Sequence, residues 1–472
     1  MFSFNRFYPF LKPYVPRMIA AAVMVMAVAA INLALLRLGG TLWDVITVQH
    51  DAARMTEMIL LLLGLVLIQG LCSMGHSYLT AWVSQRVMAD FRIHLFAHLE
   101  TLSVNFFSKR RTGELMSRLM NDVTVIQNVV TDTPIDAAKQ IVTFIGGAGF
   151  LFAMNWQLCL LILVLLPMLV VVAKLFGRRL RALSTKIQDQ TASVSTLVEE
   201  VIAGIRVVKS FVQTKREEER FVAQVQSAME LSLRRATIMA WFVPTIIFVT
   251  FAAAALVLWY GGRQVIDGSV SPGDLFAFVL FAGILIGPFG SAARVFAQIK
   301  EAQGAMQRVF EILDTHAEIA DAPGAVDLPP IRGRVRAEHI SFAYDPRQPI
   351  LSDLSFEAKP GELIAIVGPT GSGKTTIMNL LHRFYDPTAG RLTVDGHDVK
   401  DVRLDSLYRQ IALVPQDTIL FGGPIRDNIR YGREDASEEE MIAASKAAHA
   451  HEFIVGFPDG YQTIVGEKGI NL

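Results

Sequence analysis

Six long apolar stretches constrain what this chain can fold into more than any other feature. They cover approximately residues 17–38, 58–83, 135–154, 157–176, 241–260 and 275–297. A helix needs about 20 apolar residues to cross the hydrocarbon core of a bilayer, where an unpaired backbone group finds no hydrogen-bond partner. The sequence therefore predicts an all-α domain of six transmembrane helices. The third and fourth stretches are separated only by Asn155 and Trp156, so we expect a tight turn there.

The connections between these stretches alternate in charge. The connection between the second and third stretches and the one between the fourth and fifth are rich in basic residues, whereas the two opposite connections contain only Arg54 and Arg263. Basic loops stay on the cytoplasmic side of a membrane. Both chain termini are therefore predicted to be cytoplasmic. The basic residues include Arg86, Arg92, Lys109, Arg110, Arg111 and Arg118 in one connection and Arg178, Arg179, Arg181, Lys209, Lys215 and Arg216 in the other.

The two basic connections are longer than ordinary loops, and their apolar residues recur at helical spacing. They are predicted to be helices that continue out of the bilayer. Each has one break in its helical pattern, near residues 105–113 and 204–214. A short transverse helix at each break could contact a cytoplasmic partner.

Overall charge argues against a nucleic-acid partner. The chain has 44 basic and 44 acidic residues, so its formal net charge is zero. A nucleic-acid-binding protein usually shows a basic excess. The two cysteines, Cys72 and Cys159, lie within apolar runs and indicate neither a disulfide framework nor a metal cluster.

The pattern changes after the sixth stretch. Residues 314–334 contain Pro, Gly and acidic residues that interrupt helical periodicity, and short β-rich runs follow at 334–344, 351–358, 363–368, 391–396 and 411–417. We therefore predict a transmembrane domain over residues 1–313, a linker over 314–334 and a soluble α/β domain over 335–472.

The α/β domain contains a phosphate-binding loop. The segment from Gly368 to Thr375 fits the pattern G-x-x-x-x-G-K-[ST] and lies between an apolar run and a helical run. Glycines let the backbone wrap a phosphate, Lys374 supplies a cation, and the Thr375 hydroxyl can bind Mg²⁺. By chance this pattern would occur in about one in a hundred chains of this length. The predicted nucleotide-contacting residues are Gly368, Pro369, Thr370, Gly371, Ser372, Gly373, Lys374, Thr375 and Thr376.

Taken together, these features resemble the exporter type of ATP-binding cassette (ABC) transporter, over nearly the whole chain. The order of six spans, long cytoplasmic helices, linker and phosphate-loop domain is that of this family. Local sequence marks of the resemblance lie at residues 198–211, 340–351, 381–396 and 411–432. The fold that the resemblance implies is a six-helix transmembrane domain plus an α/β P-loop nucleotide-binding domain.

The resemblance implies roles for particular residues, with ATP and Mg²⁺ as cofactors. Tyr344 matches the aromatic position that stacks on adenine, and Gln416 matches a glutamine that reaches Mg²⁺ and the attacking water. The alternatives are an aromatic that packs a strand edge and an ordinary loop amide. The tips near 107–116 and 211–215 resemble coupling helices that dock on nucleotide domains, and the alternative for them is a solvated basic surface.

The chain departs from the family pattern at its end. In the resembled family, the stretch up to Leu472 is followed by a signature motif, a catalytic glutamate and a switch histidine. We therefore expect the nucleotide-binding domain to be incomplete at the C-terminus and ATP hydrolysis to belong to a longer parent protein. The alternative that this leaves open is a truncated, non-transporting or regulatory membrane nucleotide-binding subunit.

The function that the resemblance implies is ATP-driven export by a dimer of half-transporters, either identical or different, in a bacterial inner membrane. Membrane lipids and a hydrophobic or amphipathic cargo are the expected partners. Spans that contain phenylalanine and methionine favour such cargo because their side chains adapt to varied shapes. Arg37, His76 and Arg294 are ionisable residues within the spans and are candidates for contacting it.

Overall fold

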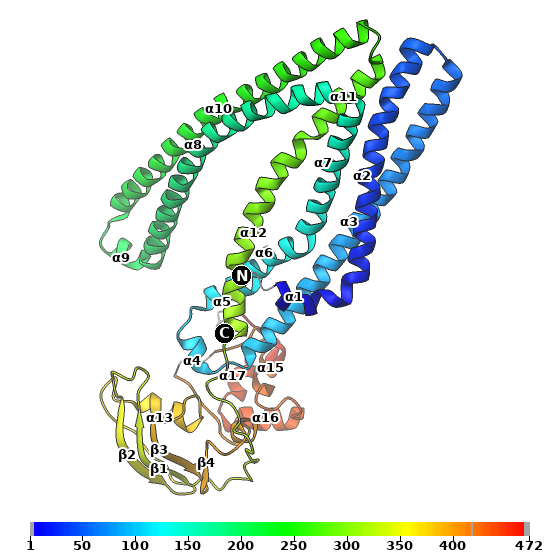
Figure 1. Ribbon diagram of the computed structural model, residues 1–472. Coiled ribbons are helices and arrows are strands. Elements are labelled where there is room, and N and C mark those ends of the chain that lie inside the picture. Colours follow the sequence, from blue (N-terminus) through cyan, green and yellow to red (C-terminus); the bar gives the residue numbers. More distant parts are fainter. Residues whose placement is uncertain (1–3, 417–418, 467–472) are drawn as a thin grey trace. The chain divides into compact units, whose positions relative to one another are not determined.

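The computed structural model describes residues 4–416 and 419–466, which form two compact units (Figure 1). Residues 4–101 and 110–316 form the first, which we call the membrane unit. Residues 102–109 and 317–466 form the second, the nucleotide unit. The short segment 102–109 therefore clusters with the C-terminal part of the chain. The domain boundaries predicted from the sequence stay a prediction.

Helices make up the membrane unit. They are α1 (Phe4–Leu11), η1 (Lys12–Tyr14), α2 (Val15–Asp44), η2 (Val45–Gln49), α3 (Ala52–Glu100), α5 (Thr112–Ser117), η3 (Arg118–Asp122), α6 (Val123–Gln127), η4 (Asn128–Asp132), α7 (Thr133–Met154), α8 (Trp156–Ala203), α9 (Ile205–Ser210), α10 (Thr214–Ile266), α11 (Pro272–Ile284) and α12 (Ile286–Leu313).

Four helical stretches of the described chain are long and apolar enough to cross a membrane. They are Arg6–Gln49, Ala52–Glu100, Thr112–Met154 and Thr214–Ile266, and they contain four of the six predicted spans. Helices α3, α8 and α10 have 49, 48 and 53 residues. At 1.5 Å per residue each is about 70–80 Å long, more than twice the thickness of the hydrocarbon core. The predicted helical membrane domain is confirmed, and the continuation of its helices out of the bilayer stays a prediction.

A single non-helical residue joins α7 to α8, as the sequence predicted. Asn155 is extended, with φ −158° and ψ 101°, and its side-chain oxygen accepts hydrogen bonds from the backbone N–H groups of Gln157 and Leu158 at 3.1 and 3.0 Å. This capping satisfies two of the N–H groups that a helix start leaves unpaired. Predicted span 157–176 lies within the continuous helix α8.

The sixth predicted span is not one continuous helix. Helix α11 ends at Ile284 and α12 begins at Ile286, with Leu285 in a turn between them. Pro288 has no N–H and cannot bond the carbonyl of Ile284, so the helical ladder is interrupted there. The expectation of an unbroken helix over 275–297 was wrong for this reason.

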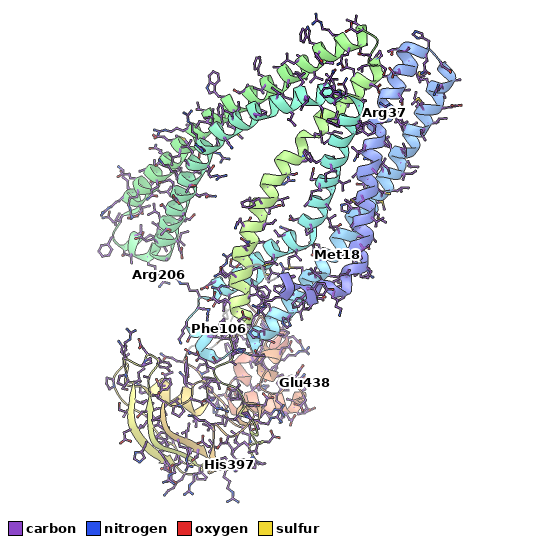
Figure 2. The ribbon with its side chains drawn as sticks, viewed as in Figure 1. Met18, Arg37, Phe106, Arg206, His397 and Glu438 are labelled. Atoms are coloured by element: carbon purple, nitrogen blue, oxygen red, sulfur yellow. The ribbon has the colours of Figure 1, made fainter. Side chains whose placement is uncertain are left out.

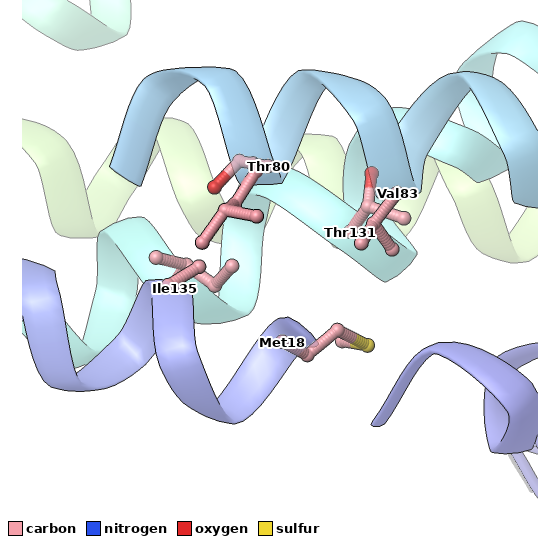
Figure 3. Close-up of a pocket in the computed structure, with 7 residues that line it drawn as sticks. Met18, Thr80, Val83, Thr131 and Ile135 are labelled. Carbon is pink, nitrogen blue, oxygen red and sulfur yellow. The ribbon is translucent and has the colours of Figure 1, made fainter. Parts of the chain in front are cut away.

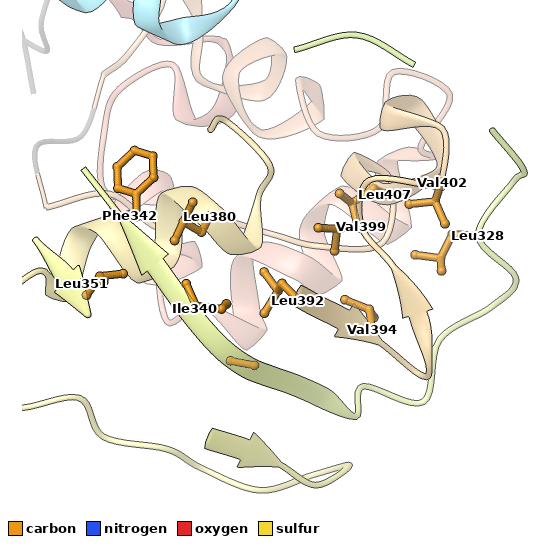
Figure 4. Packing of buried hydrophobic residues seen from close by; sticks show 11 residues of the cluster. Leu328, Ile340, Phe342, Leu351, Leu380, Leu392, Val394, Val399, Val402 and Leu407 are labelled. Carbon is orange, nitrogen blue, oxygen red and sulfur yellow. The ribbon is translucent and has the colours of Figure 1, made fainter. Parts of the chain in front are cut away.

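The nucleotide unit contains an antiparallel sheet in the order β2-β1-β3-β4. Its strands are β1 (Val335–Phe342), β2 (Leu351–Ala358), β3 (Ala389–Val394) and β4 (His397–Asp398). Helix α13 (Lys374–Leu381) contributes Leu380 to the hydrophobic core, which also contains Ile340, Phe342 and Leu392 (Figure 4). The core therefore fixes the helix that starts at Lys374.

Smaller elements complete the nucleotide unit. They are α4 (Val104–Ser108), α14 (Leu404–Tyr408), β5 (Gly423–Pro424), α15 (Ile425–Arg430), α16 (Glu438–Ala447), α17 (His451–Val455), η5 (Gly460–Gln462) and β6 (Ile464–Val465). Helix α16 begins with a capping box, in which the Ser437 hydroxyl accepts from the Glu440 N–H and the Glu440 carboxylate accepts from the Ser437 N–H.

Two predicted strands do not form. Residues 363–368 and the described part of 411–417 have no strand structure, and Leu363 and Val414 are 97% and 91% exposed. A strand forms only where a neighbouring backbone pairs with it. Within the described residues, no backbone ladder reaches either segment. The other three β-rich runs are confirmed as β1, β2 and β3.

Candidate functional site

The phosphate-binding loop has a backbone that requires glycine. Gly371 and Gly373 have φ angles of 85° and 90°, a region that residues with a side chain rarely adopt. A Cβ atom added to Gly373 would lie 2.7 Å from Leu351 Cδ2, so the Leu351 side chain of strand β2 would have to shift. Helix α13 starts at the next residue, Lys374, which directs the N-terminal end of the helix at the loop.

The Lys374 amine lies across this loop. Its Nζ donates hydrogen bonds to the carbonyl oxygens of Gly368 and Pro369, both at 2.9 Å. The Ser372 N–H donates to the Pro369 carbonyl at 3.2 Å. The cation that a phosphate would need therefore lies at the loop, where two loop carbonyls are its partners.

The two threonines at the start of α13 differ in exposure. Thr375 is exposed, whereas Thr376 is 5% exposed and faces the interior. The Thr375 hydroxyl is therefore available to a metal ion at the loop. The buried Thr376 side chain is not, so Thr376 has only its backbone N–H to offer to a phosphate.

Tyr344 is tied to the same helix. Its hydroxyl oxygen accepts a hydrogen bond from Asn379 Nδ2 of α13 at 3.0 Å. The Tyr344 ring lies edge-on to Phe342 and Tyr385, with centroid distances of 4.8 and 4.9 Å, and 41% of the residue is exposed. Sequence reasoning missed Asn379 and Tyr385, although Tyr385 lies in the segment 381–396 that carries the family resemblance.

An ion pair borders the exposed tyrosine. The Arg347 guanidinium donates to both carboxylate oxygens of Asp345, at 3.1 and 2.8 Å, and the Arg347 N–H donates to the same carboxylate. These bonds hold the pKa of Asp345 below its usual value. Because both side chains are exposed, the pair orders the loop after Tyr344 and adds little stability.

Gln416 is exposed and is the last residue described before position 419. Among the described residues, no hydrogen bond joins the Gln416 side chain to the phosphate-binding loop. The structure therefore brings together the loop, Lys374, Thr375 and Tyr344 through helix α13, and joins Gln416 to them by no hydrogen bond among the described residues.

Helix α4 also contributes to the nucleotide unit. Phe106 is only 6% exposed, and Asn105 Nδ2 donates to the Glu318 carboxylate. The hydroxyls of Ser108 and Tyr385 are 3.4 Å apart. Because Tyr385 packs against Tyr344, a short chain of contacts joins the α4 tip to the aromatic ring beside α13.

In the membrane unit, Arg37 pairs with Asp274 of α11 (Figure 2). Nearby, the Asp44 carboxylate accepts from the Gly273 N–H at 2.6 Å and from the Ser271 hydroxyl at 2.7 Å. Arg37, one of the three candidates for contacting cargo, therefore has a structural partner where α2 approaches α11.

A hollow between α2, α3, η4 and α7 is lined by Met18, Thr80, Val83, Thr131 and Ile135, among others (Figure 3). It has no room for a water-sized molecule. We therefore treat it as a packing junction and not as a cargo site.

The fold and the site define a class of protein, in which a membrane-spanning helical domain is joined to a P-loop nucleotide-binding domain. Comparison with family models supports the same description. Residues 18–289 match the ABC transporter transmembrane region, and residues 351–466 match the ABC transporter nucleotide domain. The chain belongs to the ABC transporter family and is an exporter-type half-transporter. Its nucleotide-domain match implies that it binds ATP.

Individual relatives are similar over most of the chain. An ATP-dependent lipid A-core flippase of Syntrophus aciditrophicus is 37% identical over 99% of this chain and 78% of its own length. A flippase of the same name from Desulfotalea psychrophila is 37% identical over 99% of this chain and 82% of its own length. A putative multidrug export ATP-binding/permease protein of Bacillus subtilis is 34% identical over 84% of this chain and 68% of its own length.

Proposed function

We propose that this chain binds Mg·ATP at residues 368–376 and, paired with a second half-transporter, uses it to export lipids or drugs of amphipathic character. The observation that carries the proposal is the position of the Lys374 amine across the phosphate-binding loop, 2.9 Å from two of its carbonyls. A phosphate that entered the loop would replace these carbonyls as the partner of the amine and would gain a charge-assisted hydrogen bond.

Each predicted site residue has a role in this proposal. Lys374 and the loop N–H groups hold the phosphates and offset the charge that develops during transfer. Thr375 supplies a hydroxyl ligand to Mg²⁺, and Gln416 is a further candidate ligand that also orients water. Tyr344, with 41% of its surface exposed, offers a ring face for stacking on adenine. Mg²⁺, when bound, adds positive charge beside the phosphates.

The cargo class rests on the relatives and on the apolar helices. One relative is named a lipid A-core flippase and another a putative multidrug export protein, which supports lipids or drugs as the cargo. The membrane unit exposes large apolar side chains such as Leu67, Met74 and Phe251 along its helices. We infer a bacterial inner-membrane location with both termini cytoplasmic, which the alternating charge of the connections supports.

The nucleotide part of the proposal is tested by calorimetry with Mg·ATP on the folded protein and its Lys374→Ala variant. We expect Lys374→Ala to abolish measurable binding, because the charge-assisted hydrogen bond from the amine to the phosphates is lost. Lys359→Ala is the matched control, because Lys359 is an exposed lysine of the same unit outside the loop. Binding by Lys374→Ala as tight as that of the starting protein would contradict the proposed site.

The cargo part is tested separately in proteoliposomes. We expect ATP-dependent transport and ATPase stimulation with a labelled lipid or a hydrophobic dye. Stimulation by small hydrophilic solutes alone would refute the cargo class and leave the nucleotide site standing.

A further inference from the structure

Two arginine side chains lie near the ring of one tryptophan where α2 and α3 lie side by side (Figure 1). The Arg17 guanidinium carbon is 3.9 Å from the centroid of the Trp82 ring, and that of Arg86 is 5.8 Å away. Both arginines are exposed. In the described part of the chain, neither guanidinium makes a hydrogen bond or an ion pair, so two cations share one aromatic ring without a carboxylate partner.

The nearest carboxylate along α3 has another partner. Asp90, one helical turn beyond Arg86, accepts a hydrogen bond from the Tyr14 hydroxyl at 2.6 Å. Tyr14 lies within the electrostatic reach of both arginines. The cluster therefore contains two positive charges and one negative charge, and its net charge is positive.

The same ring borders an open hollow of about 360 Å³, which is lined by Tyr78, Ala81, Trp82, Gln85 and Arg86. Tyr78 precedes Trp82 by four residues, so the two aromatic side chains lie on one face of α3. Tyr78 is 67% exposed. The hollow thus has an aromatic wall and a cationic rim.

The depth of the cluster along the helices matches the edge of a bilayer. Predicted span 17–38 begins at Arg17, and predicted span 58–83 ends one residue after Trp82. Trp and Tyr concentrate at the headgroup level, and basic residues there face the cytoplasm. The cytoplasmic leaflet is also the leaflet that carries anionic lipid.

We propose that Arg17 and Arg86 bind the phosphate of an anionic phospholipid from the cytoplasmic leaflet, with Trp82 and Tyr78 packed against its glycerol and upper acyl chain. Guanidinium groups match phosphate oxygens with paired N–H donors. The stack on Trp82 holds the Arg17 guanidinium in place before the lipid arrives, which lowers the entropy lost on binding. This site lies outside the nucleotide unit and does not depend on ATP binding.

The experiment uses the full chain in bilayers with Trp82 as its only tryptophan, the other four of the five being replaced by Phe. Brominated phosphatidylglycerol and brominated phosphatidylcholine are compared as quenchers of Trp82 fluorescence. We expect preferential quenching by phosphatidylglycerol. Arg17→Gln and Arg86→Gln should each lower that preference about fivefold.

Matched variants separate the site from general membrane charge. Arg17→Lys with Arg86→Lys keeps both charges but loses the paired guanidinium donors, so its preference should lie between those of the starting chain and the double Gln variant. This variant also guards against loss of folding in the Gln variants. A second chain keeps Trp259 as its only tryptophan, and the centroid of that ring lies 5.1 Å from the Arg263 guanidinium carbon. Quenching of Trp259 should not change when Arg17 and Arg86 are replaced.

A final measurement tests whether the site binds a lipid headgroup or free phosphate. Inorganic phosphate at matched ionic strength should leave the phosphatidylglycerol preference of Trp82 unchanged. Displacement of the lipid by inorganic phosphate would overturn the proposal in favour of a free-anion site. Equal quenching by the two lipids in the starting chain, or an unchanged preference in the double Gln variant, would overturn it as well.

Discussion

The two predicted cytoplasmic tips have the same local structure and opposite surroundings. Each is a short helix, α4 at one tip and α9 at the other, and both lie where the sequence breaks its helical pattern (Figure 2). Phe106 of α4 is 6% exposed within the nucleotide unit. At the α9 tip, Phe211 and Val212 are 70% and 84% exposed.

This difference shows that similar sequence patterns can mark both a buried tip, at α4, and an exposed tip, at α9. The aromatic side chain of Phe106 at the α4 tip is buried. The α9 tip presents adjacent apolar side chains of the kind that proteins usually cover with a partner. We expect that partner to be the nucleotide unit of a second half-transporter.

The largest expected effect is on the free energy of unfolding, which should differ between variants of the two tips. Phe106→Ala removes a buried aromatic side chain and should lower the free energy of unfolding by about 3–5 kcal/mol. Chemical unfolding of the full chain in detergent, followed by a probe in the nucleotide unit, measures this. Phe211→Ala is the matched control and should change stability by about 0.5 kcal/mol or less. Equal losses for the two variants would mean that the α9 tip is also buried in the protein as it exists in solution.

The second effect concerns assembly. If Phe211 anchors the contact with a second half-transporter, Phe211→Ala should weaken that association by about 2 kcal/mol, close to 30-fold in Kd. Analytical ultracentrifugation in detergent with Mg·ATP measures the dimer. Arg206→Ala, on the same tip, is the matched control and should have a smaller effect (Figure 2). Dimerisation that is insensitive to Phe211→Ala would show that the exposed ring does not anchor the dimer.

A third effect arises from the backbone of the α9 tip. Val212 has φ 55°, a left-handed conformation that costs a residue with a branched Cβ about 1–2 kcal/mol. Val212→Gly should relieve this strain and stabilise the protein by about 1 kcal/mol. Val207→Gly, inside α9, should instead destabilise it by a similar amount, about 1 kcal/mol. Thermal unfolding distinguishes the two signs, and destabilisation by both variants would show that Val212 is unstrained.

The sequence predicted features that depend on neighbours along the chain. Strand β2 coincides with the predicted run 351–358, and Asn155 caps α8 where the apolar pattern is interrupted. The phosphate-binding loop followed from glycine, lysine and threonine at fixed spacing. In each case the residues that determine the structure lie within a few positions of one another.

Features that depend on distant neighbours were missed. The run 363–368 has the composition of a strand, but composition cannot supply the backbone partner that a strand needs. The Asn379 amide and the Tyr385 ring meet Tyr344 only because α13 packs on the sheet. Burial of Phe106 likewise depends on a fold in which segment 102–109 joins a unit formed by residues beyond 316.

The smallest expected effect tests what holds the α4 tip in place. Tyr385→Phe removes the hydroxyl that lies 3.4 Å from the Ser108 hydroxyl and keeps the ring that packs on Tyr344. Because this contact is long for a hydrogen bond between hydroxyls, its loss should cost about 0.5 kcal/mol, at the low end for such bonds. Tyr385→Ala also removes the ring and should cost more. If Tyr385→Phe destabilised the nucleotide unit as much as Phe106→Ala, polar contacts would hold α4, and the contrast between a buried tip and an exposed tip would lose its physical basis.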